Sequence, residues 1–188
     1  MSTLLEQYAH AIREFGTRVE QIGDDQWESA TPCTEWDVRA LVAHMVDEQR
    51  WVPYLLGGGS VQDAGDRFAS DPLGPDGKQS WREQSAAALE AFQAEGALDQ
   101  TVSLSYGERS ARDYIWQMTV DATVHAWDLA RGIGADDRLD HELVRRIHHE
   151  TEDDLDEMAA SGLFGPPVTV ASGADLQTRM LALFGRRG

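Results

Sequence analysis

Cysteine is nearly absent from this sequence of 188 residues, and basic side chains are scarce. Cys33 is the single cysteine, so the chain cannot form an internal disulfide or a cysteine-rich zinc site. The 16 Lys and Arg residues stand against 33 Asp and Glu, which gives a net charge of −17. Proteins that bind nucleic acid through its phosphates need clustered positive side chains. The composition therefore disfavours nucleic acid as a partner.

Long apolar segments are missing as well. No stretch approaches the ~18 consecutive apolar residues that a membrane-spanning helix requires, and Glu6 and Arg13 interrupt the N-terminal region that a secretory signal would keep apolar. We therefore expect a cytoplasmic protein with no membrane partner. The hydrophobic fraction of 41% is enough to build a core, and the length is typical of one domain.

Apolar residues recur at helical spacing along most of the chain, which predicts an all-α fold. The expected helices cover about residues 3–22, a segment that begins near Glu35 with Thr34 as its N-cap, residues 80–95, the segment between a Ser110 cap and Gly132, and residues 140–161. Pro53 lies inside the second of these and predicts a kink or an end there.

The segments between the expected helices are of two kinds. Residues 57–77 are rich in Gly and Pro and predict a long mobile connection, whereas alternating apolar residues in 101–110 predict a short extended segment. From the whole order we expect a four-helix bundle over residues 1–162. A C-terminal tail, residues 163–188, is expected to pack on that bundle.

Asp121 and His125 are four residues apart in an expected helix, so a carboxylate and an imidazole share one face. His44, near the buried face of the second expected helix, offers a third ligand. Metal sites in helix bundles form where side chains of facing helices point into the core, and three protein ligands with an open position are typical of a catalytic metal. An Asp–His hydrogen bond within one helix would also explain the pair, so the spacing alone leaves both interpretations open.

Several nearby residues are candidates for supporting roles. Asp128, three positions after His125, is placed to accept a hydrogen bond from the imidazole N–H; the alternatives are a solvated charge or a pair with Arg131 or Arg112. One or two of the tryptophans that flank the candidate ligands, together with Met118, are candidates for the wall of an apolar pocket above the metal, with core packing as the alternative. These tryptophans are Trp36, Trp51, Trp116 and Trp127. Nothing in the sequence assigns a catalytic residue.

Three sequence strings together resemble a known family. These are TPCTEWDVRALVAHMV, DATVHAWDLARGIG and GLFGPPVTVASGADLQTRMLALFGR. They are similar to the DinB/YfiT-like metal-binding four-helix bundles of actinobacteria, in particular to the group related to the N-terminal domain of mycothiol-dependent maleylpyruvate isomerase. The resemblance implies that His44 is the first metal ligand and His125 the last. Asp121 stands where the isomerase has a glutamate, which shortens one ligand by a methylene.

The resemblance also implies cofactors and a reaction class. It implies a divalent metal ion, with zinc expected and nickel or iron as alternatives, and mycothiol as a second cofactor. A metal ion beside a thiol stabilises the thiolate, which is the nucleophile. The expected function is therefore an S-transferase or isomerase that acts on a small-molecule thiol and an electrophilic substrate.

The sequence is also compatible with two other functions. One is a metal-dependent hydrolase on the same bundle, in which the ion activates water. The other is a non-catalytic metal-binding or stress-associated interaction protein. A homodimer is compatible with a bundle of this size, although no heptad pattern specifies one.

Overall fold

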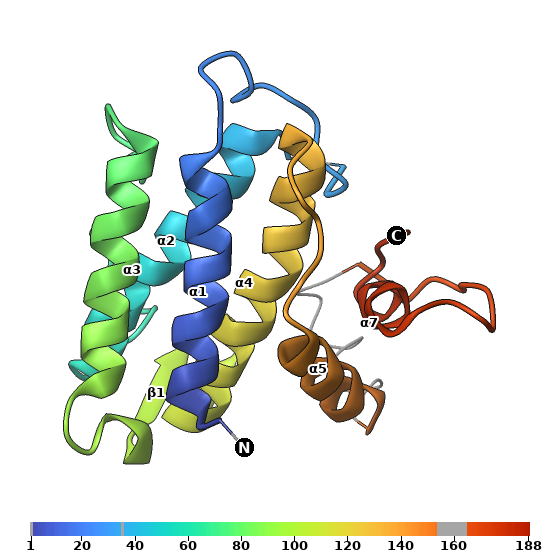
Figure 1. Cartoon of the computed structure of the whole chain (residues 1–188). Coiled ribbons are helices and arrows are strands. Elements are labelled where there is room, and N and C mark those ends of the chain that lie inside the picture. Colours follow the sequence, from blue (N-terminus) through green and yellow to red (C-terminus); the bar gives the residue numbers. More distant parts are fainter. Residues whose placement is uncertain (1, 35, 154–164) are drawn as a thin grey trace.

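The computed structural model describes residues 2–34, 36–153 and 165–188 of the chain (Figure 1). In chain order, the described elements are α1 (Leu4–Glu20), α2 (Val38–Leu56), α3 (Gly77–Gln93), the short 3₁₀ helix η1 (Ala97–Asp99), β1 (Thr101–Leu104), β2 (Gly107–Ser110), α4 (Ala111–Ile133), α5 (His141–Asp153) and α7 (Leu176–Leu183). The predicted all-α architecture with a short extended segment is confirmed.

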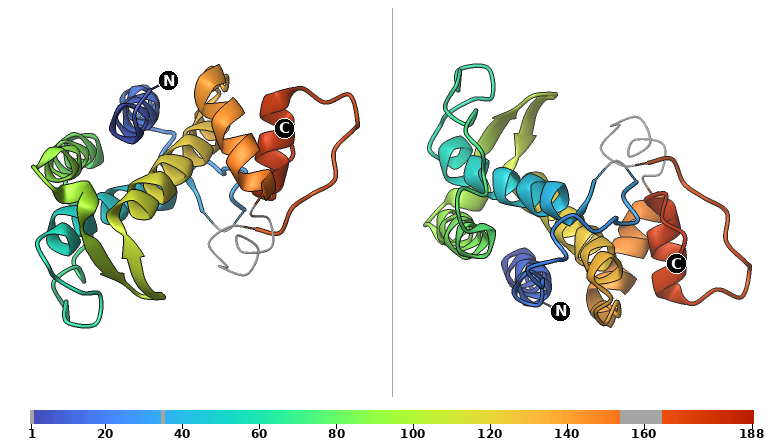
Figure 2. Two further views of the ribbon diagram at one scale, coloured as in Figure 1. Left: turned by 90° about the horizontal axis from the view of Figure 1, so that it is seen from below. Right: turned by 90° about the horizontal axis from the view of Figure 1, so that it is seen from above.

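Helices α1 to α4 form a four-helix bundle. α1 packs against α3 and α4, and α2 packs against the same two helices on the other side (Figures 1 and 2). α2 and α4 are therefore direct neighbours. This contact matters most for function, since it brings side chains from the first and second halves of the chain together.

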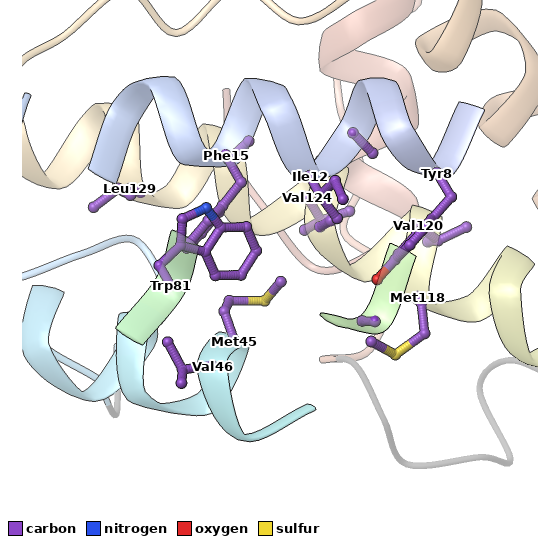
Figure 3. Packing of buried hydrophobic residues seen from close by; sticks show 14 of the residues in the cluster. Tyr8, Ile12, Phe15, Met45, Val46, Trp81, Met118, Val120, Val124 and Leu129 are labelled. Carbon is purple, nitrogen blue, oxygen red and sulfur yellow. The ribbon is translucent and has the colours of Figure 1, made fainter. Parts of the chain in front are cut away.

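Apolar side chains from all four helices meet in one core. Figure 3 shows Phe15 of α1 on the side of Met45 of α2 and Trp81 of α3, and Tyr8 of α1 on the side of Met118 of α4. The Phe15 and Trp81 rings lie 4.6 Å apart between centroids. Burying a side chain of this size contributes roughly 1.5–3 kcal/mol. The core therefore holds the relative positions of the helices that carry the candidate ligands.

Helix α2 begins later than the sequence predicted. Its N-cap is Asp37, whose carboxylate accepts a hydrogen bond from a backbone N–H of the first turn at 2.8 Å. The predicted cap at Thr34, with a start near Glu35, is wrong. The backbone N–H of Val38 donates to the carbonyl of Ser29, so the preceding loop satisfies one of the free donors of the helix start.

Two helices continue past residues at which an end was predicted, which at Pro53 was the alternative to a kink. α2 runs through Pro53, and α4 runs through Gly132 to Ile133. The C-cap of α4 is Gly134, whose φ of 70° is in the left-handed region that favours glycine. Gly132 allows close packing instead, because a Cβ there would lie 3.1 Å from Cγ2 of Thr31.

The segment predicted to be extended forms a β-hairpin. β1 and β2 pair antiparallel, with Thr101 opposite Ser110 and Leu104 opposite Gly107. The φ of Gly107 is 115°, which explains why glycine follows the turn. Ser110 then caps α4 as predicted, since its side chain accepts a hydrogen bond from the backbone N–H of Asp113.

The connection between α2 and α3 packs against α2 and the hairpin. Phe68 packs on Trp51 of α2 with 4.0 Å between ring centroids. The backbone N–H of Val61 donates to the carbonyl of Ser103 in β1. The connection is thus joined to both α2 and the hairpin.

Helices α5 and α7 pack against each other beside the bundle (Figures 1 and 2). The last predicted helix was expected to reach Ser161, and its residues 154–161 lie outside the described part of the chain, as does the predicted boundary at 162. The described part of α5 ends at Asp153. Among the described residues, no helix has the length and apolar character needed to cross a membrane.

Candidate metal centre

His44 of α2 and Asp121 and His125 of α4 converge where the two helices pack. One ligand atom from each lies within 4.8 Å of the other two. Nε2 of His44 is 3.4 Å from Oδ2 of Asp121, and Nε2 of His125 is 3.4 Å from Oδ1 of the same carboxylate. The helical spacing in α4 accounts for the second contact, and the packing of α2 on α4 accounts for the first.

This donor set fits a divalent cation. Zinc bonds of about 2.0–2.1 Å in tetrahedral geometry place two ligand atoms about 3.3 Å apart, close to both 3.4 Å separations. Within the described residues, Oδ2 of Asp121 is a buried oxygen with no hydrogen-bond partner. A buried polar atom without a partner costs free energy, and a bound cation would satisfy this one.

The electrostatics of the three side chains are dominated by the shared carboxylate. Burial alone would raise the pKa of Asp121, but the His125 and His44 imidazoles outweigh it and hold that pKa well below its usual value. Burial alone would lower the pKa of His125, but Asp121 and Asp128 outweigh it and raise the pKa to about 9. At neutral pH, a metal ion that binds His125 would therefore displace a proton from its imidazole.

Exposure differs across the site. The side chain of His125 is 4% exposed, that of Asp121 15% and that of His44 27%. The site is therefore closed around His125 and reaches solvent on the side of His44. A ligand would reach a metal ion held by these three side chains from that more open side.

Trp36 lies over both imidazoles. Its ring centroid is 4.6 Å from that of His44 and 5.5 Å from that of His125. It is one of the four tryptophans that flank the candidate ligands in the sequence. It stands directly before the Asp37 cap that begins the helix carrying His44.

Asp128 supports His125 from the buried side. Nδ1 of His125 and Oδ2 of Asp128 are 2.9 Å apart, and Asp128 is fully buried. The same carboxylate accepts hydrogen bonds from Arg186, with 2.7 Å between Nη2 and Oδ2. Sequence reasoning missed Arg186, because no local pattern links residues 58 positions apart.

Glu48 is another residue near the centre that no local sequence pattern identified. It lies one helical turn after His44 on α2 and is half-buried. Burial, reinforced by the charge of Asp121, raises the pKa of Glu48 to about 7. A proton-holding group therefore lies in the electrostatic environment of the candidate centre.

The residues predicted to wall a pocket are distributed differently. Met118 and Trp127 are 1% and 2% exposed and belong to the hydrophobic core. Trp51 is half-buried and lies between Phe68 and Asp47, whose carboxylate accepts a hydrogen bond from the Trp51 indole. Contact of these three residues with a substrate stays a prediction.

A family model and two known proteins each match most of this chain. Residues 8–130 match the family described as the mycothiol maleylpyruvate isomerase N-terminal domain. Two uncharacterized proteins of Mycobacterium tuberculosis, one from strain CDC 1551 / Oshkosh and one from strain ATCC 25618 / H37Rv, are each 34% identical over 168 residues. These alignments cover 86% of this chain and 80% of each relative.

The fold is similar to a solved enzyme structure. The mycothiol-dependent maleylpyruvate isomerase matches with a TM-score of 0.61 at 15% identity, and a mutant of it matches with a TM-score of 0.62 at 14% identity. Both matches cover 80% of this chain and 72% of the solved one. This likeness shows the fold, and it confirms the predicted DinB-like bundle. By its sequence match and its fold, the chain belongs to the family of the mycothiol maleylpyruvate isomerase N-terminal domain.

Proposed function

We propose that the protein binds one divalent metal ion through His44, Asp121 and His125 and acts on a low-molecular-weight thiol together with a small electrophilic substrate. The observation that carries this proposal is the Asp121 carboxylate, which faces Nε2 of both histidines at 3.4 Å and has a buried oxygen with no hydrogen-bond partner in the described structure. Two imidazoles and one carboxylate suit zinc, and also nickel or iron.

Several residues of this chain would have distinct roles at such a centre. When bound, the metal ion stabilises the thiolate form of a thiol. His125 is held by Asp128 on the buried side, and Trp36 covers both imidazoles. Glu48, with its pKa raised to about 7, is suited to accept or return a proton near neutral pH.

The family supports mycothiol as the thiol, since the isomerase with the same fold is named as mycothiol-dependent. The sequence identity to that isomerase is only 15%, so its name does not determine which product this chain would form. We therefore propose the reaction class, transfer or isomerisation through a thiolate, and leave the substrate at the level of a small electrophile.

Metal binding is tested directly by elemental analysis and zinc titration of the purified chain. We expect one equivalent of metal in the parent protein and less than a tenth of that in His44→Ala, Asp121→Asn and His125→Ala. His10→Ala is the matched control, since His10 lies near Glu14 and Asp140 on α1 and α5. Equal metal content in all five proteins would rule out the three-residue centre.

Activity is tested with the metal-loaded protein, mycothiol and maleylpyruvate or another electrophile. Turnover that requires both metal and thiol supports the proposal. Metal-dependent release of an acid without thiol would show a hydrolase instead, and stoichiometric metal with no turnover on a panel of electrophiles would favour a binding protein. Omitting mycothiol from otherwise identical reactions separates the first two outcomes.

A further inference from the structure

We propose that Arg186, beyond the end of α7, is a positioning residue of the candidate metal centre: its guanidinium fixes Asp128, and Asp128 fixes the ring of His125. The inference rests on the proposed function in so far as His125 is taken as a metal ligand. It assigns to the C-terminal segment, residues 165–188, a role in the centre formed by α2 and α4.

The contacts between Arg186 and Asp128 are directional. Nη2 donates to Oδ2 at 2.7 Å, and Nε lies 3.2 Å from each carboxylate oxygen. Asp128 is fully buried and Arg186 is 8% exposed. A paired guanidinium and carboxylate in the interior hold a fixed geometry, because leaving either charge unpaired there is costly.

The backbone around Arg186 is anchored as well. Its N–H donates to the carbonyl of Leu181 in α7 at 3.0 Å, and its Nη1 donates to the carbonyl of Phe184 at 2.8 Å. Gly185 has a φ of 79°, and a Cβ there would lie 3.0 Å from the carbonyl oxygen of Pro166. The turn that carries Arg186 therefore has little conformational freedom, and it holds the guanidinium against α4.

The contact between Asp128 and His125 links the fixed guanidinium to the candidate metal ligand. Nδ1 of His125 is 2.9 Å from the Asp128 oxygen that also faces Nη2 of Arg186. A hydrogen bond at Nδ1 sets the orientation of a ligating imidazole and leaves Nε2 for the metal. Arg186, Asp128 and His125 thus form a continuous chain from the C-terminal segment to the site.

This arrangement couples docking of the C-terminal segment to metal binding at residues that are distant from it in sequence. If docking of the C-terminal segment orders His125, it raises metal affinity, and metal binding must stabilise the docked segment by the same factor. Removing a hydrogen-bond partner behind a metal ligand typically costs 10–100-fold in affinity. We expect an effect of that size at Arg186.

The experiment compares zinc affinity, measured by competition with a chromophoric chelator, in the full chain and four variants. Arg186→Ala is expected to bind zinc 10–100-fold more weakly, and Arg186→Lys, which keeps the charge and one donor, to recover part of the loss. Arg187→Ala, at an exposed neighbouring position, is expected to match the parent. Phe92→Leu lowers stability through the core at a residue remote from this chain of contacts, and its affinity is expected to stay within 2-fold.

A second measurement needs no metal. Nitrogen-15 NMR of the metal-free protein reports the hydrogen bond at Nδ1 of His125, and its signal is expected to move in Arg186→Ala but not in Arg187→Ala. Unchanged zinc affinity or an unchanged Nδ1 signal in folded Arg186→Ala would overturn the inference. A parent protein that binds none of zinc, nickel and iron would overturn the proposed function, and the NMR comparison would still decide the role of Arg186.

Discussion

Nδ1 of His125 lies 2.9 Å from Oδ2 of Asp128, one turn along α4, and both side chains are excluded from solvent. Replacing Asp128 by Asn keeps the shape but removes the charge that faces both His125 and Arg186. We expect Asp128→Asn to lower zinc affinity 10–100-fold and the free energy of unfolding by about 3 kcal/mol, because Arg186 is left as a buried charge without its partner. Zinc competition and urea unfolding measure the two effects.

The control for this change is Asp99→Asn. Asp99 also pairs with an arginine, Arg112, but its side chain is 77% exposed, and exposed pairs contribute only about 0–1 kcal/mol. Equal losses in both variants would show that Asp128 has no special role.

Trp36 packs on the rings of His44 and His125. We expect Trp36→Ala to reduce the free energy of unfolding by about 2 kcal/mol, since a half-buried aromatic is removed, and to weaken zinc binding several-fold because both imidazoles gain freedom. Trp36→Phe keeps a ring and should recover most of each loss. Trp116→Ala, which removes a half-buried tryptophan packed against Arg146, should leave zinc affinity unchanged. The contrary result, equal weakening in Trp116→Ala, would mean that the effect is not local.

Glu48 makes the metal-free protein sensitive to pH. Its pKa in the fold is about 7, against an ordinary value of 4.5, so folding disfavours the ionised carboxylate. The resulting loss of stability is absent below about pH 4.5, grows as the pH rises toward 7 and is complete above 7. We expect Glu48→Gln to raise the free energy of unfolding by roughly 2 kcal/mol at pH 8 and to change it little at pH 4.5.

Urea unfolding of chelator-treated protein at the two pH values measures this difference. Glu90→Gln serves as the control, because Glu90 is exposed on α3. A Glu48→Gln variant whose stability gain is the same at both pH values would contradict the assigned cause.

Gly134 caps α4 with a φ of 70°. We expect Gly134→Ala to lower the free energy of unfolding by about 1 kcal/mol, since side-chain-bearing residues are strained in the left-handed region. Gly173→Ala is the comparison, because Gly173 has no positive φ and a Cβ there meets no atom within 4 Å. Thermal and urea unfolding of both variants test the difference, and a neutral Gly134→Ala would refute the capping role.

The helices and the candidate ligands followed from local patterns in the sequence. The positions of Asp121 and His125 on one face depend only on helical geometry, and His44 follows from the apolar stripe of its own helix. The errors arose where several residues compete for one role. Asp37 and Thr34 are both suitable N-caps, and the choice between them depends on contacts with the preceding loop.

Long-range partners were beyond such reasoning. Gly132 looked like a helix end, yet α4 continues past it. Its lack of a side chain allows Thr31, from a distant part of the chain, to pack closely against α4. Arg186 meets Asp128 only because the C-terminal segment folds back on α4. The burial that raises the pKa of Glu48 likewise depends on the assembled bundle.

The candidate ligands come from position 44 and from positions 121 and 125, on two helices that adjoin only in the folded bundle. An ion held by both helices would act as a reversible cross-link between the two halves of the chain. Because the unfolded chain has no preformed site, such an ion favours the native state in proportion to the logarithm of its free concentration. The thermal tolerance of the protein would then follow the metal supply of its surroundings.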